Sequence, residues 1–292
     1  MPANKVKVIT VFNFPYGFND LVSLDLNSSK FEKIVIDLSR MDFIYPSSVI
    51  VLAAYTISMA TKDITVEVYY PRPNEVKEYL VEIGFRQFCM NNLDTNFNIS
   101  NYNSTNSLIP IVRLEKERLH EYIQFIKKEI NNYSTGKDLS AIEICISEII
   151  NNIYDHSNGR AFCFAQYYKK KSEFVFSAYD FGIGIINQVK NFLKDPTPKE
   201  PIEYLKWAMT LGNTSHSTQH NAGKGLDNIV SQLNSNNSEL TIYANNTRYT
   251  SKENTHKFSN NPINHFEGTL IEIKISIDNL PNLELEHIEF DF

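Results

Sequence analysis

A ten-residue run, Ser147-Glu148-Ile149-Ile150-Asn151-Asn152-Ile153-Tyr154-Asp155-His156, places polar side chains in an otherwise apolar helical pattern. Glu148 and Asn152 are four residues apart, so they project from one face of the helix. A carboxylate and a carboxamide on a half-buried face are costly unless a partner compensates them. A hard cation with its bound water is one such partner. A hydrogen bond between the two side chains at the surface is the alternative.

A second run, Tyr179-Asp180-Phe181-Gly182-Ile183-Gly184-Ile185, directly follows an apolar strand pattern. Its two glycines let the backbone approach a ligand closely. Asp180, at the end of the strand, can accept a hydrogen bond from an exocyclic amine. An ordinary glycine turn accounts for the same residues, so both interpretations stay open at this point.

A third segment is polar over residues 212–222 and leads into Gly223-Lys224-Gly225-Leu226, where a helical pattern begins. Backbone amides at a helix N-terminus beside glycines form a phosphate-binding cradle, and Lys224 adds positive charge. The segment is not a Walker-type loop, because Gly225 stands where Ser or Thr would follow the lysine. Further along, Glu267-Gly268-Thr269 opens the last strand pattern.

Taken in order, these motifs are Glu-x-x-x-Asn on a helix, Asp-x-Gly-x-Gly after a strand, Gly-x-Gly-Leu after a variable segment, and Gly-Thr. The series resembles that of the Bergerat-fold (GHKL) ATPases, a superfamily that includes the histidine kinases. Within it the chain is most similar to the anti-sigma-factor serine kinases. The likeness extends over residues 114–277 and is specific because four short motifs keep one order with fitting gaps.

The resemblance implies a role for each matching residue. Glu148 would be the catalytic base that activates water or a hydroxyl, Asn152 would bind Mg²⁺, and Asp180 would accept from the adenine amino group of ATP. Thr269 would support the adenine end. The other implied site residues are Asp155 and His156 on the same helix as Asn152, Gly182 and Gly184 shaping the pocket, and Gly223, Lys224, Gly225 and Leu226 closing on the phosphates. The chain departs from many relatives at Asp227-Asn228, where they continue with Gly-Leu.

Residues 1–90 alternate strand-like and helix-like patterns, which is typical of a small α/β layer domain. Strands are expected at 5–12, 33–38 and 64–70, and helices at 46–60 and 74–83. The segment Ile34-Val35-Ile36-Asp37-Leu38-Ser39, followed by Phe43-Ile44-Tyr45-Pro46-Ser47-Ser48, resembles the STAS fold. Phosphorylated members of that family carry Asp-Ser-Ser-Gly or Asp-Ser-Thr-Gly at this turn. Here the Asp and the Gly are missing, so partner binding is favoured over phosphorylation of Ser47.

The rest of the chain divides into a linker and a second domain. Seven Asn with Ser and Thr over residues 91–110 indicate the linker. Beyond it, helices are expected at 119–130, 138–156, 185–194, 202–211 and 226–233, and strands at 160–168, 172–179, 240–245 and 269–277, with a hairpin end or loop over 245–264. The sequence therefore predicts an α+β protein: a STAS-like α/β domain over 1–90, a linker over 91–110, and over 111–292 a Bergerat α/β sandwich, a mixed sheet covered by helices.

Composition limits the class of protein. The 292 residues are 42% apolar and 21% charged, with a net charge of -6, which indicates a globular protein without the basic surface that nucleic acid requires. Cys89, Cys145 and Cys163 lie in apolar surroundings and are expected to be reduced core residues. The longest apolar run, 49–60, is too short for a bilayer, and the N-terminus lacks a signal-peptide pattern. We expect a cytoplasmic protein without membrane contact.

Together these features predict a signalling switch that binds ATP and Mg²⁺. It would hydrolyse ATP or transfer the γ-phosphate to a Ser or Thr of a protein partner, with the STAS-like domain as the partner-binding or regulatory module. An interaction module that binds ATP without hydrolysing it is the alternative. A homodimer is possible, since Bergerat relatives often dimerise. Transfer of radiolabel from ATP to a protein band would indicate a kinase, and release of phosphate would indicate an ATPase.

Overall fold

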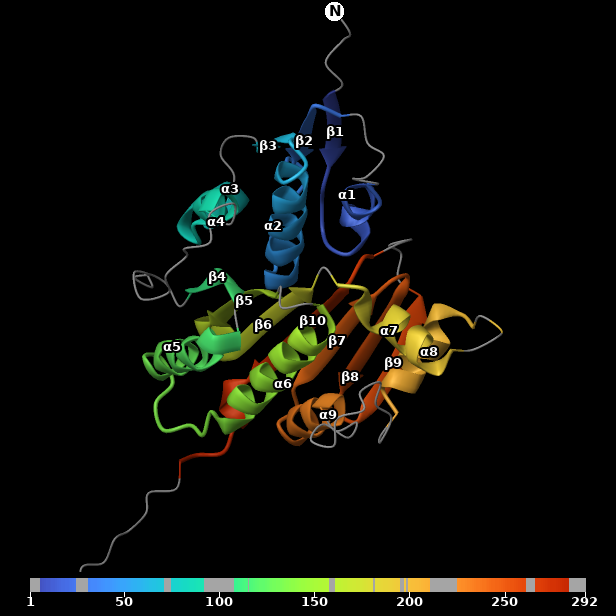
Figure 1. Cartoon of the computed structure of the whole chain (residues 1–292). Helices are drawn as coiled ribbons and strands as arrows, with labels where there is room; N and C mark the ends of the chain where they lie inside the picture. Colours follow the sequence, from blue (N-terminus) through green and yellow to red (C-terminus); the bar gives the residue numbers. More distant parts are fainter. Residues whose placement is uncertain are drawn as a thin grey trace, which may run out of the picture.

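The computed structural model describes residues 6–24, 31–70, 75–91, 108–114, 116–157, 161–180, 182–194, 197, 199–210, 225–260 and 266–283. These residues form an α+β protein with one three-stranded and one seven-stranded sheet (Figure 1). Most of the predicted linker and the closing residues 284–292 lie outside the described part. None of the described helices combines the length and the apolar character needed to cross a membrane.

The N-terminal unit is built on the three-stranded sheet, whose strands are parallel and lie in the order β1-β2-β3. Its elements are β1 (Val6–Thr10), α1 (Asn19–Val22), β2 (Lys33–Asp37), α2 (Pro46–Ala60), β3 (Thr65–Tyr69), α3 (Glu75–Glu82) and α4 (Phe85–Asn91). Parallel neighbours need a crossover, and α2 provides it between β2 and β3. The strands and helices expected here are confirmed, while α1 and α4 were not predicted.

Helix α2 is buried on all sides. It starts at Pro46, preceded by Tyr45 in an extended conformation, and every residue from Pro46 through Ile57 is buried. A helix that is apolar around its whole circumference requires cover on all sides. Ser47 and Ser48 in its first turn are only 4% and 2% exposed. The hydroxyl of Ser47 is therefore not accessible to a kinase in this structure.

The C-terminal unit is built on the seven-stranded sheet, in the order β4-β5-β6-β10-β7-β8-β9. Its strands are β4 (Leu108–Leu114), β5 (Ala161–Tyr168), β6 (Glu173–Asp180), β7 (Glu239–Ala244), β8 (Thr247–Lys252), β9 (Thr255–Asn260) and β10 (Thr269–Ser276). The expected mixed sheet is wrong, because every pairing described is antiparallel. Strands β6 and β7 run in the same direction but do not pair, since β10 lies between them. Strand β4 starts inside the predicted linker, and β8 and β9 fall where a hairpin end or loop was expected.

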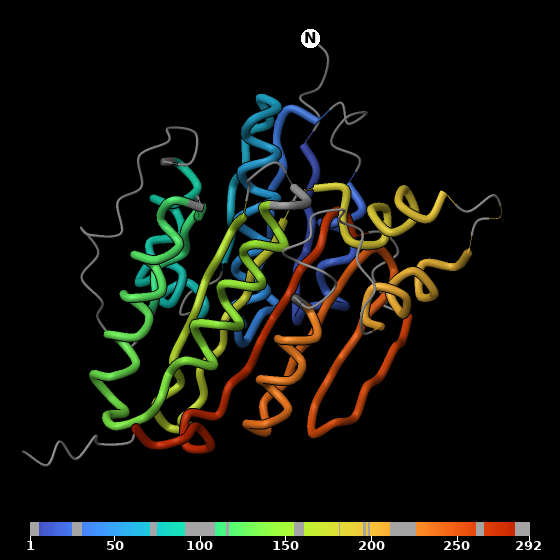
Figure 2. Tube along the Cα trace, turned by 60° about the horizontal axis from the view of Figure 1, so that its bottom comes forward, coloured from blue at the N-terminus to red at the C-terminus, as the bar shows by residue number. Residues whose placement is uncertain are grey.

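Five helices follow the predicted patterns: α5 (Leu119–Asn131), α6 (Ser140–Ser157), α7 (Gly184–Leu193), α8 (Pro201–Ala208) and α9 (Gly225–Ser235). Helices α5, α6 and α9 cover one face of the seven-stranded sheet (Figures 1 and 2). Successive side chains along a strand point to opposite faces of the sheet. On β5, Ala161, Cys163 and Ala165 pack with these helices, and the three cysteines are free and buried as predicted.

The opposite face of the large sheet is covered by the N-terminal unit. Helix α2 contacts β5, β6 and β10, where Phe162, Phe164 and Tyr179 belong to the same apolar core as the small sheet. The hydroxyl of Tyr79 on α3 donates to Oε1 of Gln166 on β5 at 2.7 Å. The N-terminal unit and this face of the large sheet therefore share one apolar core, which is separate from the core between the large sheet and α5, α6 and α9.

Candidate functional site

Helix α6 holds the first two candidate residues. It begins after Asp138, whose carboxylate accepts from the Ser140 backbone N–H at 2.9 Å, and it buries the predicted apolar stripe of Ile142, Cys145, Ile149 and Ile153. Glu148 and Asn152 are half-buried beside this stripe. The described residues contain no hydrogen bond between the Glu148 and Asn152 side chains. The alternative interpretation, in which the two side chains pair with each other, therefore finds no support.

Asp180 lies at the end of β6, directly opposite Thr269 at the start of β10. Its carboxylate is 4% exposed and accepts from the Gly182 N–H at 2.7 Å, and from both the hydroxyl and the backbone N–H of Thr269. Burial raises the pKa of Asp180 from 3.8 to about 6, although these hydrogen bonds lower it. The Thr269 oxygen also accepts from the Ile185 N–H at 2.9 Å, in the first turn of α7.

Two glycines allow this close arrangement of backbones. Gly184 and Gly268 both have positive φ, at +74° and +76°. A Cβ on Gly184 would lie 2.7 Å from the Gly268 carbonyl oxygen, and one on Gly268 would overlap the Asp180 carbonyl oxygen. Gly184 therefore shapes the backbone beside Asp180. Gly268 was part of the quoted motif but had no predicted role; a glycine directly before the first residue of a strand pattern was the available signal.

A small cavity brings four of the predicted residues together. Its volume is about 50 Å³, and it is lined by Asn152, Ile153, Asp180, Ile185, Leu226, Thr269 and Ile271. The lining comes from α6, β6, α7, α9 and β10, so five separate segments converge. At roughly 10–15 Å³ per water position, this volume takes a few water molecules. An adenine ring needs more, so its entry requires the walls to move apart.

Asn152 contributes an uncompensated polar group to this cavity. Its Nδ2 is buried and has no hydrogen-bond partner among the described residues. Such a group costs free energy unless a ligand or a water satisfies it. The Asp180 carboxylate, with about four acceptor positions and three donors already in place, has room for one more donor. The cavity thus presents one free donor and one free acceptor position.

The remaining predicted residues divide into two groups. Glu148 lies one turn before Asn152 on α6 and is not part of the cavity lining. Gly225 starts α9, and the next residue, Leu226, lines the cavity, so the first turn of this helix lies beside it. Gly223, Lys224 and the side chains of Asp155 and His156 lie outside the described residues.

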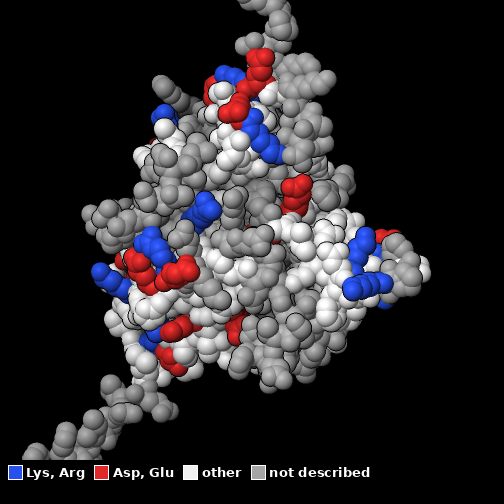
Figure 3. All heavy atoms as spheres, in the orientation of Figure 1, with Lys and Arg blue, Asp and Glu red and all other residues white. Residues whose placement is uncertain are grey.

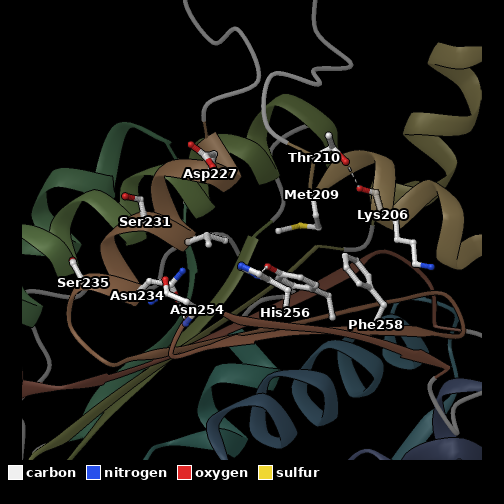
Figure 4. A pocket seen from close by; sticks show the side chains of 12 residues that line it. Lys206, Met209, Thr210, Asp227, Ser231, Asn234, Ser235, Asn254, His256 and Phe258 are labelled. Atoms are coloured by element: carbon white, nitrogen blue, oxygen red, sulfur yellow. Dashed lines mark hydrogen bonds between the residues drawn. The ribbon is translucent and has the colours of Figure 1, made fainter.

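A larger hollow of about 700 Å³ lies between α8, α9 and the β8–β9 hairpin (Figure 4). Met209 points into it from the end of α8, while His256 and Phe258 line it from β9. The Nδ1 of His256 is hydrogen-bonded to the Tyr249 hydroxyl at 2.8 Å. None of the predicted site residues lines this hollow, and half of its lining side chains carry hydroxyls or amides, mixed with apolar and charged ones. We assign no chemistry to it.

The distribution of charged side chains and of possible metal ligands bears on two other kinds of site, a nucleic-acid surface and a metal centre held by protein side chains. On the face shown in Figure 3, the described Lys and Arg residues are interspersed with Asp and Glu, without a broad basic area. Among the described residues, no three His, Cys, Asp or Glu side chains gather as metal ligands. No protein-family model matches the chain, and no curated protein matches it either.

Proposed function

We propose that this chain binds Mg²⁺-ATP at the cavity between α6, β6, β10 and the start of α9. The observation that carries the proposal is the Asp180 carboxylate, which is buried, held by three hydrogen bonds and still able to accept one more. An exocyclic amine of a purine is a donor that suits this position. The fixed geometry of the carboxylate favours one orientation of the base.

The metal part of the proposal rests on Asn152. Mg²⁺ in phosphate-transfer sites is usually held by one or two protein oxygens together with phosphate oxygens and water. A single carboxamide facing the cavity fits such a site better than a dedicated protein cage, for which the described residues offer no cluster. The carbonyl oxygen of Asn152 would hold the ion, and its uncompensated Nδ2 would donate to a phosphate oxygen. When bound, Mg²⁺ neutralises charge on the phosphates.

The output we propose is phosphate chemistry in a signalling switch. Glu148, next to Asn152 on α6, would take a proton from water, which gives ATP hydrolysis, or from a Ser or Thr hydroxyl of a protein partner, which gives phosphate transfer. The N-terminal unit would act as the regulatory or partner-binding module. Its position supports this, since α2 packs on the same strands, β6 and β10, that carry Asp180 and Thr269.

A second candidate is an interaction module that binds ATP without turnover. One observation favours it: Glu148 does not line the cavity. The two candidates share the nucleotide site and differ only in whether Glu148 reaches the attacking group.

Nucleotide binding is tested by thermal unfolding of the full chain in buffer, Mg²⁺-ADP and Mg²⁺-ATP. A ligand that binds only the folded state raises Tm in proportion to its occupancy. We expect a rise for the wild type and for Asp42→Asn, an exposed control, but not for folded Asp180→Asn. No rise in the wild type, or an equal rise in both variants, would refute the assignment. Two further assays then distinguish the outcomes. Phosphate release indicates hydrolysis, transfer of radiolabel from ATP to protein indicates kinase activity, and the absence of both indicates binding alone.

A further inference from the structure

A second large hollow lies on the other side of the N-terminal unit, between β3, the end of α2, α3 and α4. Its volume is about 730 Å³, which is in the usual range of small-molecule sites, roughly 300–1,000 Å³. In the described part of the chain, β3 pairs only with β2, and α4 packs against α2. Figure 1 shows α3 and α4 beside α2. The free edge of β3 therefore forms one wall of the hollow.

Most of the lining is apolar. It includes Val66, Val68, Leu80, Val81, Phe85 and Met90. Val81 and Met90 are exposed to 64% and 59%, although both are large apolar side chains. Apolar surface gathered in a concave site indicates a ligand with an apolar body.

One buried polar group in the hollow lacks a partner. Thr56 on α2 is 9% exposed, and its Oγ1 has no hydrogen-bond partner among the described residues. A threonine inside a helix ordinarily satisfies its hydroxyl through the carbonyl one turn earlier. Thr56 lines the hollow, so a bound ligand would lie next to a residue whose buried hydroxyl gains a hydrogen bond if a small shift turns it toward a ligand oxygen.

The charges around the hollow favour an anion. Two cationic residues, Lys77 and Arg86, belong to the lining, together with one acid, Glu67. Glu67 is already paired with Lys33. The exposed guanidinium of Arg86 has no ion pair or hydrogen bond within the described residues. Arginine binds carboxylates in a planar, two-point geometry, so an unpaired one beside apolar residues suits a carboxylate head group.

We infer that this hollow binds an amphiphile with an apolar chain and a carboxylate head group, such as a medium-chain fatty acid. The chain would pack on the valines of β3 and on α3 and α4. Arg86 would pair with the head group, and the Thr56 hydroxyl would donate to a ligand oxygen. The site is separate from the nucleotide cavity, since the two have no lining residue in common.

The test is calorimetric titration of the full chain with dodecanoate below its micelle concentration, without nucleotide. Dodecyltrimethylammonium, with the same chain and a cationic head, is the ligand control. We expect saturable binding of dodecanoate alone, weakened about tenfold by Arg86→Gln, the effect of losing one charged hydrogen-bonding partner. Arg40→Gln, at an exposed arginine outside the hollow, should leave the affinity unchanged. Val81→Trp, which fills the hollow from an exposed position, should abolish binding while the chain stays folded.

Equal binding of both amphiphiles, equal effects of the two arginine variants, or no binding of dodecanoate would overturn the inference. None of these results involves ATP. A chain that binds Mg²⁺-ATP but not dodecanoate would refute this site alone, and the reverse result would refute only the nucleotide site.

Discussion

Thr269 lies directly opposite Asp180 where β10 pairs with β6, and it donates to the Asp180 carboxylate through both its hydroxyl and its backbone N–H. The same Thr269 oxygen accepts the Ile185 N–H at 2.9 Å. One side chain therefore connects the end of β6, the start of β10 and the first turn of α7. These three segments form much of the wall of the cavity at which we propose nucleotide binding.

Thr269→Val tests this connection, because valine keeps the shape of threonine but lacks the hydroxyl. The Ile185 N–H loses its acceptor and Asp180 loses a donor, so we expect the free energy of unfolding to fall by about 1–3 kcal/mol. The pKa of Asp180 should rise further, since a hydrogen bond that lowers it is lost. Urea unfolding measures the first effect. Thr255→Val, at an exposed position on β9, should change stability little, and similar losses in both variants would contradict the role of the hydroxyl.

Gly268→Ala tests the backbone contact beside Asp180. The new Cβ would overlap the Asp180 carbonyl oxygen, so the two strands must separate and we expect a folded state weakened by more than about 3 kcal/mol. Gly136→Ala is a matched control. Gly136 has φ +77°, close to the +76° of Gly268, but nothing lies within 4 Å of its Cβ position. Strain in φ alone should cost about 1 kcal/mol. Equal losses of Tm would show that the contact itself contributes nothing.

The sequence predicted the elements that have strong periodicity. Helix α6 and strands β5 and β6 carry clear apolar patterns, and the structure places them within a residue or two of the expected bounds. Strand β9 was missed because it lies at the sheet edge and most of its residues are exposed, so it has no apolar alternation. Strand β4 contains Pro110 and follows an Asn-rich segment, which favoured a linker.

The candidate site was predictable as a set of residues but not as a geometry. Asn152, Asp180, Leu226 and Thr269 were identified from four short motifs, and the structure gathers them around one cavity. That Gly268 packs on Asp180 depends on the register between β6 and β10, which no local pattern records. The apolar pattern of α2 likewise indicated burial without indicating which surface covers the helix. Long-range pairings of this kind are decided by the packing of the whole chain.

The raised pKa of Asp180 predicts a pH dependence of stability. The folded chain keeps the proton up to about pH 6, whereas the unfolded chain loses it near pH 3.8. The contribution of this group to stability is therefore complete below pH 3.8 and is lost as the pH rises through 6. The loss is about 3 kcal/mol, from a shift of about two pKa units. Since other carboxylates also titrate here, the measurement is the difference between wild type and Asp180→Asn in urea unfolding from pH 3.5 to 7. Parallel curves would contradict the raised pKa.

Glu148→Ala separates turnover from binding. If Glu148 is the base, phosphate release or label transfer should fall by about 10²–10⁴-fold, while the rise in Tm with Mg²⁺-ATP persists. Glu117→Ala, at an exposed acid before α5, should retain turnover. Unchanged turnover in Glu148→Ala would remove this residue from catalysis. Absence of turnover in the wild type, with an intact rise in Tm, would favour the binding module.

Helix α2 is joined to the segments that line the proposed nucleotide site by two buried phenols. The Tyr55 hydroxyl lies 3.2 Å from the Val22 carbonyl oxygen, and the Tyr179 hydroxyl lies 2.6 Å from that of Glu267. The two phenols are also hydrogen-bonded to each other. Burial raises the pKa of both phenols, so they stay neutral and act as donors. Tyr179 precedes Asp180 in the chain, and Glu267 precedes Gly268, so this group is adjacent to the two strands that line the proposed adenine end.

A double-mutant cycle of Tyr55→Phe and Tyr179→Phe measures this connection. Each single change should lower the free energy of unfolding by about 1–2 kcal/mol, since a buried polar group loses a partner. Because the two hydroxyls are hydrogen-bonded to each other, each change removes a partner of the other, so the changes should not add, with a coupling of about 0.5 kcal/mol or more. Tyr69→Phe, at a half-exposed tyrosine on β3, should add to Tyr179→Phe without coupling. If Tyr55→Phe also weakens Mg²⁺-ATP binding, α2 transmits the state of the N-terminal unit to the nucleotide site. Additive stabilities with unchanged ATP affinity would limit α2 to a structural role.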